Sequence, residues 1–216
     1  MRALAIASVT VTVLGLTTAP AHAETWRGQD ASGDVKSFQV DLLKPCKPPT
    51  GERSLPDDRR HDLTTLAVVH GADAVSVQLG LRDVVPHDRG TSYELVVRTP
   101  DGMYDVQVTT SSSGRTVSSF ATAEVTHDPG CAYLDTHQRR CRGFTAKIDP
   151  LQDLVAVTVP RTCVGEPRWV RVGAWVAGFD PDSGSVEDPV VPVTFDAAGS
   201  RGGVITVLPP FGPKVH

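Results

Sequence analysis

Two tryptophans and an arginine alternate with small apolar residues in "PRWVRVGAWV", residues 167 to 176. Successive side chains of a strand point to opposite faces, so Trp169, Arg171 and Trp175 share the face opposite the aliphatic residues. Exposed aromatic rings stack on sugar rings, and a guanidinium donates hydrogen bonds to sugar hydroxyls. These three residues are the predicted ligand-binding site, unless a loop covers this face or a bulge turns a tryptophan inward.

An acidic stretch, "FDPDSGSVED", follows at residues 179 to 188. Its carboxylates are Asp180, Asp182, Glu187 and Asp188, and carboxylate oxygens are the ligands that Ca²⁺ prefers. The stretch departs from the EF-hand template, and Asp-Pro and Asp-Ser-Gly are also common in turns. We expect either a Ca²⁺ site or an ordinary acidic loop.

A second acidic group would form if "DASGD", residues 30 to 34, folds back near the start of a strand over residues 63 to 70. Asp30, Asp34 and Asp62 would then lie close together. Their oxygens are suited to the same cation. The group depends on a long-range contact, so it is the weaker of the two Ca²⁺ candidates.

Motifs for catalysis and for haem are absent. The chain contains no G-x-S-x-G, H-E-x-x-H or S-x-x-K sequence. Met103 with one of the histidines at 70, 87 and 127 has ligand types that haem accepts, but no paired spacing and no C-x-x-C-H accompanies them. The sequence therefore disfavours an enzyme without excluding one, and we expect no cofactor apart from Ca²⁺.

Four cysteines, Cys46, Cys131, Cys141 and Cys163, lie beyond the N-terminal region. An even number in an exported chain favours disulfides, and no C-x-x-C is present to bind zinc or carry redox chemistry. A hairpin that turns near Leu151 places Cys141 opposite Cys163, which leaves Cys46 to pair with Cys131. The alternative is a bond between Cys131 and Cys141.

The N-terminus has the organisation of a secretory signal peptide. Arg2 is a short positive region, residues 3 to 16 are uncharged, and "AHA" before residue 24 fits a small-x-small cleavage site. Residues 1 to 23 are the predicted leader, and residues 24 to 216 are predicted to form a single secreted, extracellular domain. No segment reaches the ~20 apolar residues of a spanning helix, so membrane insertion is not expected.

The charge balance is mildly acidic. The 216 residues include 21 Lys and Arg against 25 Asp and Glu, a formal net charge of −4 without a long basic run. Proteins that bind nucleic acid present clustered positive charge to the phosphates. Nucleic acid is therefore not an expected partner.

Short alternating segments separated by Gly, Pro and Asp dominate the chain. The clearest is "DAVSVQLGLR", residues 73 to 82, and two segments around the turn "TPDG" are predicted to form a hairpin over residues 92 to 110. Further strands are expected at 36–42, 63–70, 115–126, 142–148, 154–160, 168–178, 190–195 and 203–208. The pattern predicts an all-β fold, an antiparallel β-sandwich of roughly eight to ten strands stapled by two disulfides.

Two segments are predicted to lie outside the sheets. The proline-rich stretch 44 to 62 is expected to be a long surface loop pinned by Cys46, because prolines interrupt strand pairing. The tail from residue 209 to 216 is expected to be loosely docked.

Four stretches carry a resemblance to known proteins: "DASGDVKSF", "DLTTLAVVHGADAVSVQLGLRDV", "YELVVRTPDGMYDVQV" and "VPRTCVGEPRWVRVGAWV". Together they resemble a group of secreted actinobacterial β-sandwich proteins and, more distantly, modules of the DOMON and family 9 carbohydrate-binding type. The resemblance covers most of the chain after the leader and includes no catalytic motif. It implies the fold, and it implies ligand binding because DOMON-like domains bind haem or sugars.

The leading functional hypothesis is a secreted, non-catalytic binding module for a cell-envelope or environmental glycan. A structural or protein-interaction protein, which pairs a sheet edge or its loops with another secreted protein, is the alternative. A hydrolase without a recognised motif is the least favoured hypothesis. The tryptophan and arginine face is the observation on which the leading hypothesis depends.

Overall fold

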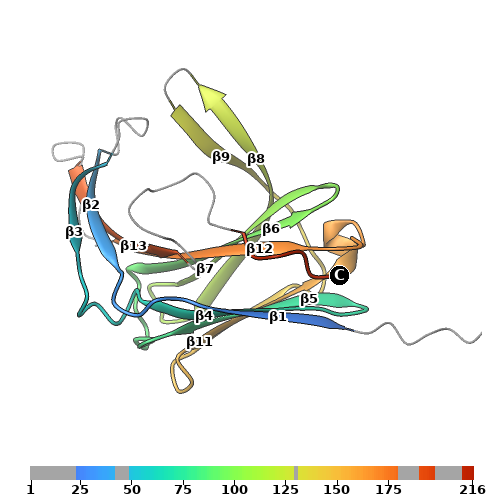
Figure 1. The fold of residues 1–216 in the computed structure, drawn as a ribbon, viewed down its shortest axis with the longest axis horizontal. Coiled ribbons are helices and arrows are strands. Elements are labelled where there is room, and N and C mark those ends of the chain that lie inside the picture. The colour runs from blue at the N-terminus through green and yellow to red at the C-terminus, as the bar shows by residue number, and fades with distance from the viewer. Residues whose placement is uncertain (1–22, 42–48, 129–130, 180–189, 198–210) are drawn as a thin grey trace, which may run out of the picture.

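The chain folds into two antiparallel β-sheets in a computed structural model that describes residues 23–41, 49–128, 131–179, 190–197 and 211–216. The five-stranded sheet has the order β1 (Glu24–Gln29), β4 (Leu63–His70), β5 (Ala74–Leu81), β11 (Leu154–Pro160) and β10 (Thr145–Asp149). The eight-stranded sheet has the order β3 (Thr50–Ser54), β2 (Lys36–Asp41), β13 (Val190–Ala197), β12 (Arg171–Phe179), β6 (Thr91–Thr99), β7 (Gly102–Thr110), β8 (Thr116–Asp128) and β9 (Cys131–Gln138) (Figure 1). The only helical element among these residues is a 3₁₀ turn, η1 (Arg161–Val164).

One hydrophobic cluster draws on both sheets. Val68 of β4 and Val77 of β5 belong to it, together with Leu95 of β6 and Val106 of β7. In each of these strands the clustered residues alternate with residues of the opposite face, because the side-chain period of a strand is two. Burial of this apolar surface is the main favourable contribution to folding. The predicted all-β class and antiparallel pairing are confirmed.

The hairpin of β10 and β11 is closed at its open end by the disulfide Cys141–Cys163, with 5.6 Å between the Cα atoms. Ala146 pairs with Val157 in the register that a turn near Leu151 requires. The predicted bond is confirmed, and the alternative bond from Cys141 to Cys131 is wrong. Cys46 lies outside the described residues, so its bond to Cys131 stays a prediction.

The described residues contain more strands than the eight to ten expected. Most expected strands are present within a few residues of their predicted bounds, and the segment 203 to 208 lies outside the described residues. The additional strands are β1, β3 and β9. β3 corrects the prediction of a loop over residues 44 to 62: residues 50 to 54 contain no proline and pair with β2 at the edge of the sheet.

The C-terminal segment, residues 211 to 216, corrects a second prediction. Val215 forms a two-way backbone bridge with Val170, at 2.8 Å in each direction, and is 1% exposed within the core cluster. The backbone N–H of Gly212 donates to the carbonyl of Val172 at 3.0 Å. The segment is therefore docked along the start of β12, and it is not loose.

Candidate functional site

A row of polar and aromatic residues crosses the face of the eight-stranded sheet that points away from the core cluster. Glu94 of β6 stands opposite Trp175 of β12 on one side and opposite Gln107 of β7 on the other. Cross-strand partners share a face, so the three side chains lie side by side. We call Trp175, Glu94, Gln107, Ser92 and Asp105 the outer polar row.

Hydrogen bonds connect four of these residues. The Ser92 hydroxyl donates to Oε1 of Glu94 at 3.4 Å, and Nε2 of Gln107 donates to the Ser92 hydroxyl at 3.2 Å and to Oε1 of Glu94 at 3.5 Å. The Trp175 side chain also hydrogen-bonds the Glu94 carboxylate. Burial raises the pKa of Glu94, and these hydrogen bonds offset part of the rise. The donors on three neighbouring strands therefore surround one carboxylate.

Asp105 extends the row diagonally, since it precedes Gln107 by two residues on β7 and so points to the same face. Its Oδ1 atom is buried and has no hydrogen-bond partner. Burial, and then the charge of Glu94, raise the pKa of Asp105 to about 7. A carboxyl group that is partly protonated near neutral pH donates as well as accepts hydrogen bonds, as does a sugar hydroxyl.

The aliphatic face of the predicted ligand-binding strand is in the core, as expected: Val170, Val172, Ala174 and Val176 are each at most 1% exposed. The three predicted site residues lie on the opposite face and are half-buried. They have different surroundings. Trp175 belongs to the outer polar row, whereas Trp169 and Arg171 contact the C-terminal segment.

The C-terminal segment contacts the ring of Trp169 and the guanidinium of Arg171. The Lys214 ammonium lies 4.5 Å from the centroid of the Trp169 ring. Nε of Arg171 donates to the carbonyl of Gly212 at 2.8 Å, and its Nη2 donates to the carbonyl of Phe211 at 3.2 Å. These two residues therefore hold the chain's own C-terminal segment, and Trp175 is the one of the three that faces the other polar side chains.

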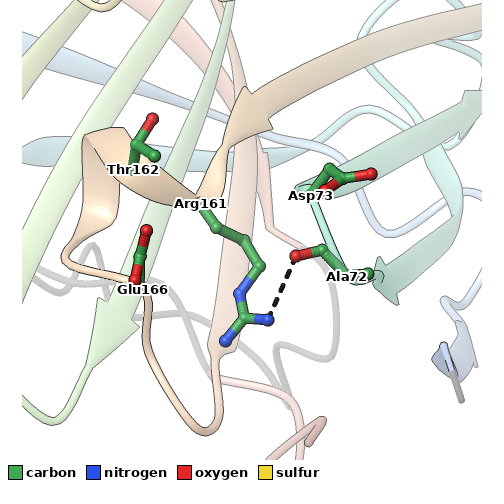
Figure 2. A pocket seen from close by; sticks show the side chains of 5 residues that line it. All are labelled: Ala72, Asp73, Arg161, Thr162 and Glu166. Atoms are coloured by element: carbon green, nitrogen blue, oxygen red, sulfur yellow. Dashed lines mark hydrogen bonds between the residues drawn. The ribbon is translucent and has the colours of Figure 1, made fainter. Parts of the chain in front are cut away.

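A pocket of about 280 Å³ lies at the end of the five-stranded sheet (Figure 2). It is lined by Ala72, Asp73, Arg161, Thr162 and Glu166. Nη1 of Arg161 donates to the carbonyl of Ala72 at 3.2 Å, and Nη2 donates to the carbonyl of Pro167 at 2.7 Å. The guanidinium thus ties the β4–β5 turn to the segment after η1. Because it is engaged in this way and no aromatic residue lines the pocket, we rank the pocket below the outer polar row.

One group of side chains, a carboxylate, a histidine and a hydroxyl, has the order of a catalytic triad. Nδ1 of His61 lies 2.9 Å from Oδ2 of Asp58, and its Nε2 lies 3.1 Å from the Thr91 hydroxyl oxygen. However, the Thr91 hydroxyl donates to Oδ2 of Asp88 at 2.7 Å, and Thr91 is 1% exposed. A nucleophile must reach its substrate and give its proton to the base. This network fastens the turn before β4 to the start of β6.

The described residues contain no group of three or more His, Cys, Asp or Glu side chains placed to hold a metal ion. The predicted acidic loop with Asp180, Asp182, Glu187 and Asp188 lies outside the described residues. The predicted approach of "DASGD" to Asp62 is confirmed, because the backbone N–H of Gly33 donates to Oδ2 of Asp62 at 2.8 Å. No helix in the described part of the chain has the length and apolar character needed to cross a membrane.

Sequence reasoning missed Glu94, Asp105 and Gln107. Their only local signal is a polar residue at an outward position of an alternating strand, which is the commonest pattern in any sheet. Their grouping depends on the pairing of β6 with β12, whose partners Glu94 and Trp175 are far apart in the chain. A search with the sequence and the structure found no matching family model, no matching curated protein and no matching solved structure.

Proposed function

We propose that the protein is a secreted, non-catalytic binding module and that its ligand is an extended glycan of the cell envelope or the environment. The observation that carries the proposal is the outer polar row. It combines an aromatic side chain, two carboxyl groups, an amide and a hydroxyl on adjacent strands. Sugar sites use this combination, because aromatic rings stack on the sugar and fixed polar groups bond its hydroxyls.

Two further parts of the proposal concern the chain as a whole. We propose that the two sheets form a β-sandwich, which the shared core cluster supports. We propose export by the leader at residues 1 to 23 and a second disulfide between Cys46 and Cys131. The Cys141–Cys163 bond supports export, because disulfides persist mainly in oxidising compartments. The resemblance to DOMON-type and family 9 carbohydrate-binding modules implies ligand binding without identifying the ligand.

Retention of the purified protein on insoluble chitin, cellulose and peptidoglycan tests the glycan proposal. We expect the wild type to be retained and both Gln107→Ala and Trp175→Ala to bind about tenfold more weakly. Gln107→Ala removes a hydrogen-bonding group from the site, and Trp175→Ala removes the ring that would stack on the sugar. Gln152→Ala is the matched control, because Gln152 is exposed in the β10–β11 turn. Trp169→Ala is the second control, because Trp169 contacts Lys214 instead of the row.

Two results would contradict the proposal in different ways. Equal retention of the wild type and of both row variants would mean that the glycan binds elsewhere. No retention on any of the three polymers would contradict the glycan proposal and favour a protein partner.

A protein-interaction role is the second candidate, and the β8–β9 ribbon favours it. β7 pairs with β8 only up to Ala123, so residues 124 to 128 of β8 pair with β9 alone. The ribbon projects from the rest of the molecule (Figure 1), and Tyr133 on it is 42% exposed. Two-stranded ribbons are marginally stable in water. Concentration-dependent self-association that Tyr133→Lys abolishes, measured by light scattering, would support this role.

A further inference from the structure

The connection between β1 and β2 contains the turn "DASGD", and this turn meets a buried carboxylate at the start of β4. Asp62 is 0% exposed. Its Oδ2 atom accepts the Gly33 backbone N–H at 2.8 Å and Nη1 of Arg82 at 2.6 Å. Gly33 has φ of 84°, in the left-handed region that favours glycine. The turn is therefore shaped to bring its backbone to Asp62.

The second oxygen of Asp62 has no such partner. Oδ1 of Asp62 is buried and accepts no hydrogen bond, and Oδ1 of Asp34 is in the same condition. Buried carboxylate oxygens are costly unless a donor or a cation satisfies them. Burial, and to a smaller extent the charge of Asp62, raise the pKa of Asp34. The two carboxylates are thus close enough to repel each other.

Nearby cations only partly balance these charges. Arg82 contacts Asp62 through Oδ2 and also donates to the carbonyl of Pro56 at 3.0 Å. Lys36, which follows the turn, pairs with Glu52 of β3. Of the two aspartates, Arg82 therefore contacts only Asp62, the charge of Lys36 acts on Asp34 without an ion pair to it, and Oδ1 of each aspartate has no hydrogen-bond partner.

We propose that this turn and Asp62 bind a divalent cation, Ca²⁺, through Oδ1 of Asp34 and Oδ1 of Asp62. Asp30, Ser32 and Asp34 have the spacing of the first three ligands of a Ca²⁺ loop, at positions one, three and five. Ca²⁺ takes six to eight oxygens, so turn oxygens and water complete the set. The described residues contain no group of three or more His, Cys, Asp or Glu side chains arranged to hold a metal ion. The proposed site therefore takes two carboxylate oxygens from the chain and depends on turn oxygens and water for its other ligands.

The position of the turn gives the cation a structural role. β1 belongs to the five-stranded sheet and β2 to the eight-stranded sheet, so the turn crosses between the sheets. Asp62 directly precedes β4, the neighbour of β1. A cation between Asp34 and Asp62 therefore fastens the crossing segment to the five-stranded sheet. This role is independent of the outer polar row.

Thermal unfolding of the purified protein with CaCl₂ and with EDTA tests the site. Ca²⁺ at about 100 times its Kd is expected to raise the Tm of the wild type by about 5 to 10 °C. Asp34→Asn is expected to lose this rise. Its Tm in EDTA is expected to equal or exceed that of the wild type, because the substitution removes a buried charge that Asp62 repels. Asp57→Asn, a matched change at an exposed residue of the next loop, is expected to keep the full rise.

Three results would overturn the proposal. The first is no rise in the wild type. The second is an equal rise in Asp34→Asn, which would place the cation elsewhere, such as the acidic loop at 180 to 188. The third is an Asp34→Asn variant that is more stable than the wild type while Ca²⁺ has no effect on either protein, which would mean that the two carboxylates repel each other and hold no cation. The Asp182→Asn variant changes the acidic loop and leaves Asp34 and Asp62 intact. Calorimetric titration of this variant with CaCl₂ is expected to show one Ca²⁺ bound per chain.

Discussion

The two faces of β6 and β7 differ sharply although they alternate along the same backbone. On the inner face, Leu95, Val97 and Val106 are at most 1% exposed and belong to the core cluster. On the outer face, Glu94, Asp105 and Gln107 form the outer polar row described above. The inner face contributes stability through apolar burial, and it fixes the strands that position the outer face. The core cluster and the proposed binding residues thus lie on opposite faces, although Val96, the cross-strand partner of Asp105, is also 0% exposed on the outer face. Mutations can therefore test the two faces separately.

Each sheet also contains a buried ionisable side chain whose charged form is disfavoured, and one example from each sheet can be compared. Asp105 lies on the outer face of the eight-stranded sheet, where burial disfavours its charged form. His70 is the last residue of β4 and is 4% exposed, and its ring lies close to the backbone of Val215 and His216. Because one is an acid and the other a base, their effects on stability should appear at opposite ends of the pH range.

Leu95→Ala is expected to have the largest effect. It leaves a cavity in the centre of the inner face and should lower the free energy of unfolding by about 3 kcal/mol. Urea denaturation at pH 7 measures this. Val117→Ala, at a residue that is 50% exposed on β8, is the control and should change stability by less than about 0.5 kcal/mol. Similar losses in the two variants would contradict the assignment of stability to the inner face.

Asp105→Asn is expected to stabilise the protein at alkaline pH. The pKa of Asp105 is about 7 in the folded chain against an ordinary value of 3.8, so the unfolded state releases its proton first. Stability of the wild type therefore falls as pH rises from about 4 to about 7. At pH 8 the variant should be more stable by on the order of 2 to 4 kcal/mol, with no difference near pH 4. Denaturant melts across this range test the sign.

His70→Gln is expected to act at the acidic end. Burial, and then the charge of Arg161, lower the pKa of His70 below its ordinary 6.5, although the carbonyls of His216 and Val215 and the charge of Glu24 oppose this. The unfolded state therefore binds the proton first, and the wild type loses stability as pH falls below about 6.5, by at most about 1.4 kcal/mol per pH unit. The variant should lack this loss. An identical acid dependence in both proteins would exclude His70 as its cause.

Gln107→Ala is expected to have the smallest effect on stability. Its side chain is exposed, and its two hydrogen bonds are at the long end of the normal range. The free energy of unfolding should change by less than about 0.5 kcal/mol, while glycan retention falls as described above. A variant that loses both stability and retention would show that the outer row also supports the fold.

The sequence predicted local pairings well. The β10–β11 hairpin, its register and its disulfide followed from an Asp-Pro turn and the distances of Cys141 and Cys163 from it. The β6–β7 hairpin followed from "TPDG" in the same way. In both cases, the turn and the alternation act over a few residues and agree with each other.

The sequence could not predict features that depend on distant partners. β1 has a single large apolar residue, Trp26, and gains its pairing only because β4 lies beside it. Trp175 was placed on the correct face, but its partner Glu94 belongs to a strand that no local signal connects to it. The docking of the C-terminal segment onto Trp169 and Arg171 likewise depends on long-range contacts.

The pairing of β5 with β11 has a consequence for the folding kinetics of the five-stranded sheet. It joins Val77 to Val157, eighty positions later in the chain (157 − 77 = 80), so the entropy of closing a long loop must be overcome before these contacts form. Until then β11 presents an unpaired edge with Val155, Val157 and Val159, a valine-rich segment of high β-propensity. The disulfide-closed hairpin protects the edge that faces β10. Intermolecular pairing of β11 during refolding is therefore expected at the edge that β5 later covers.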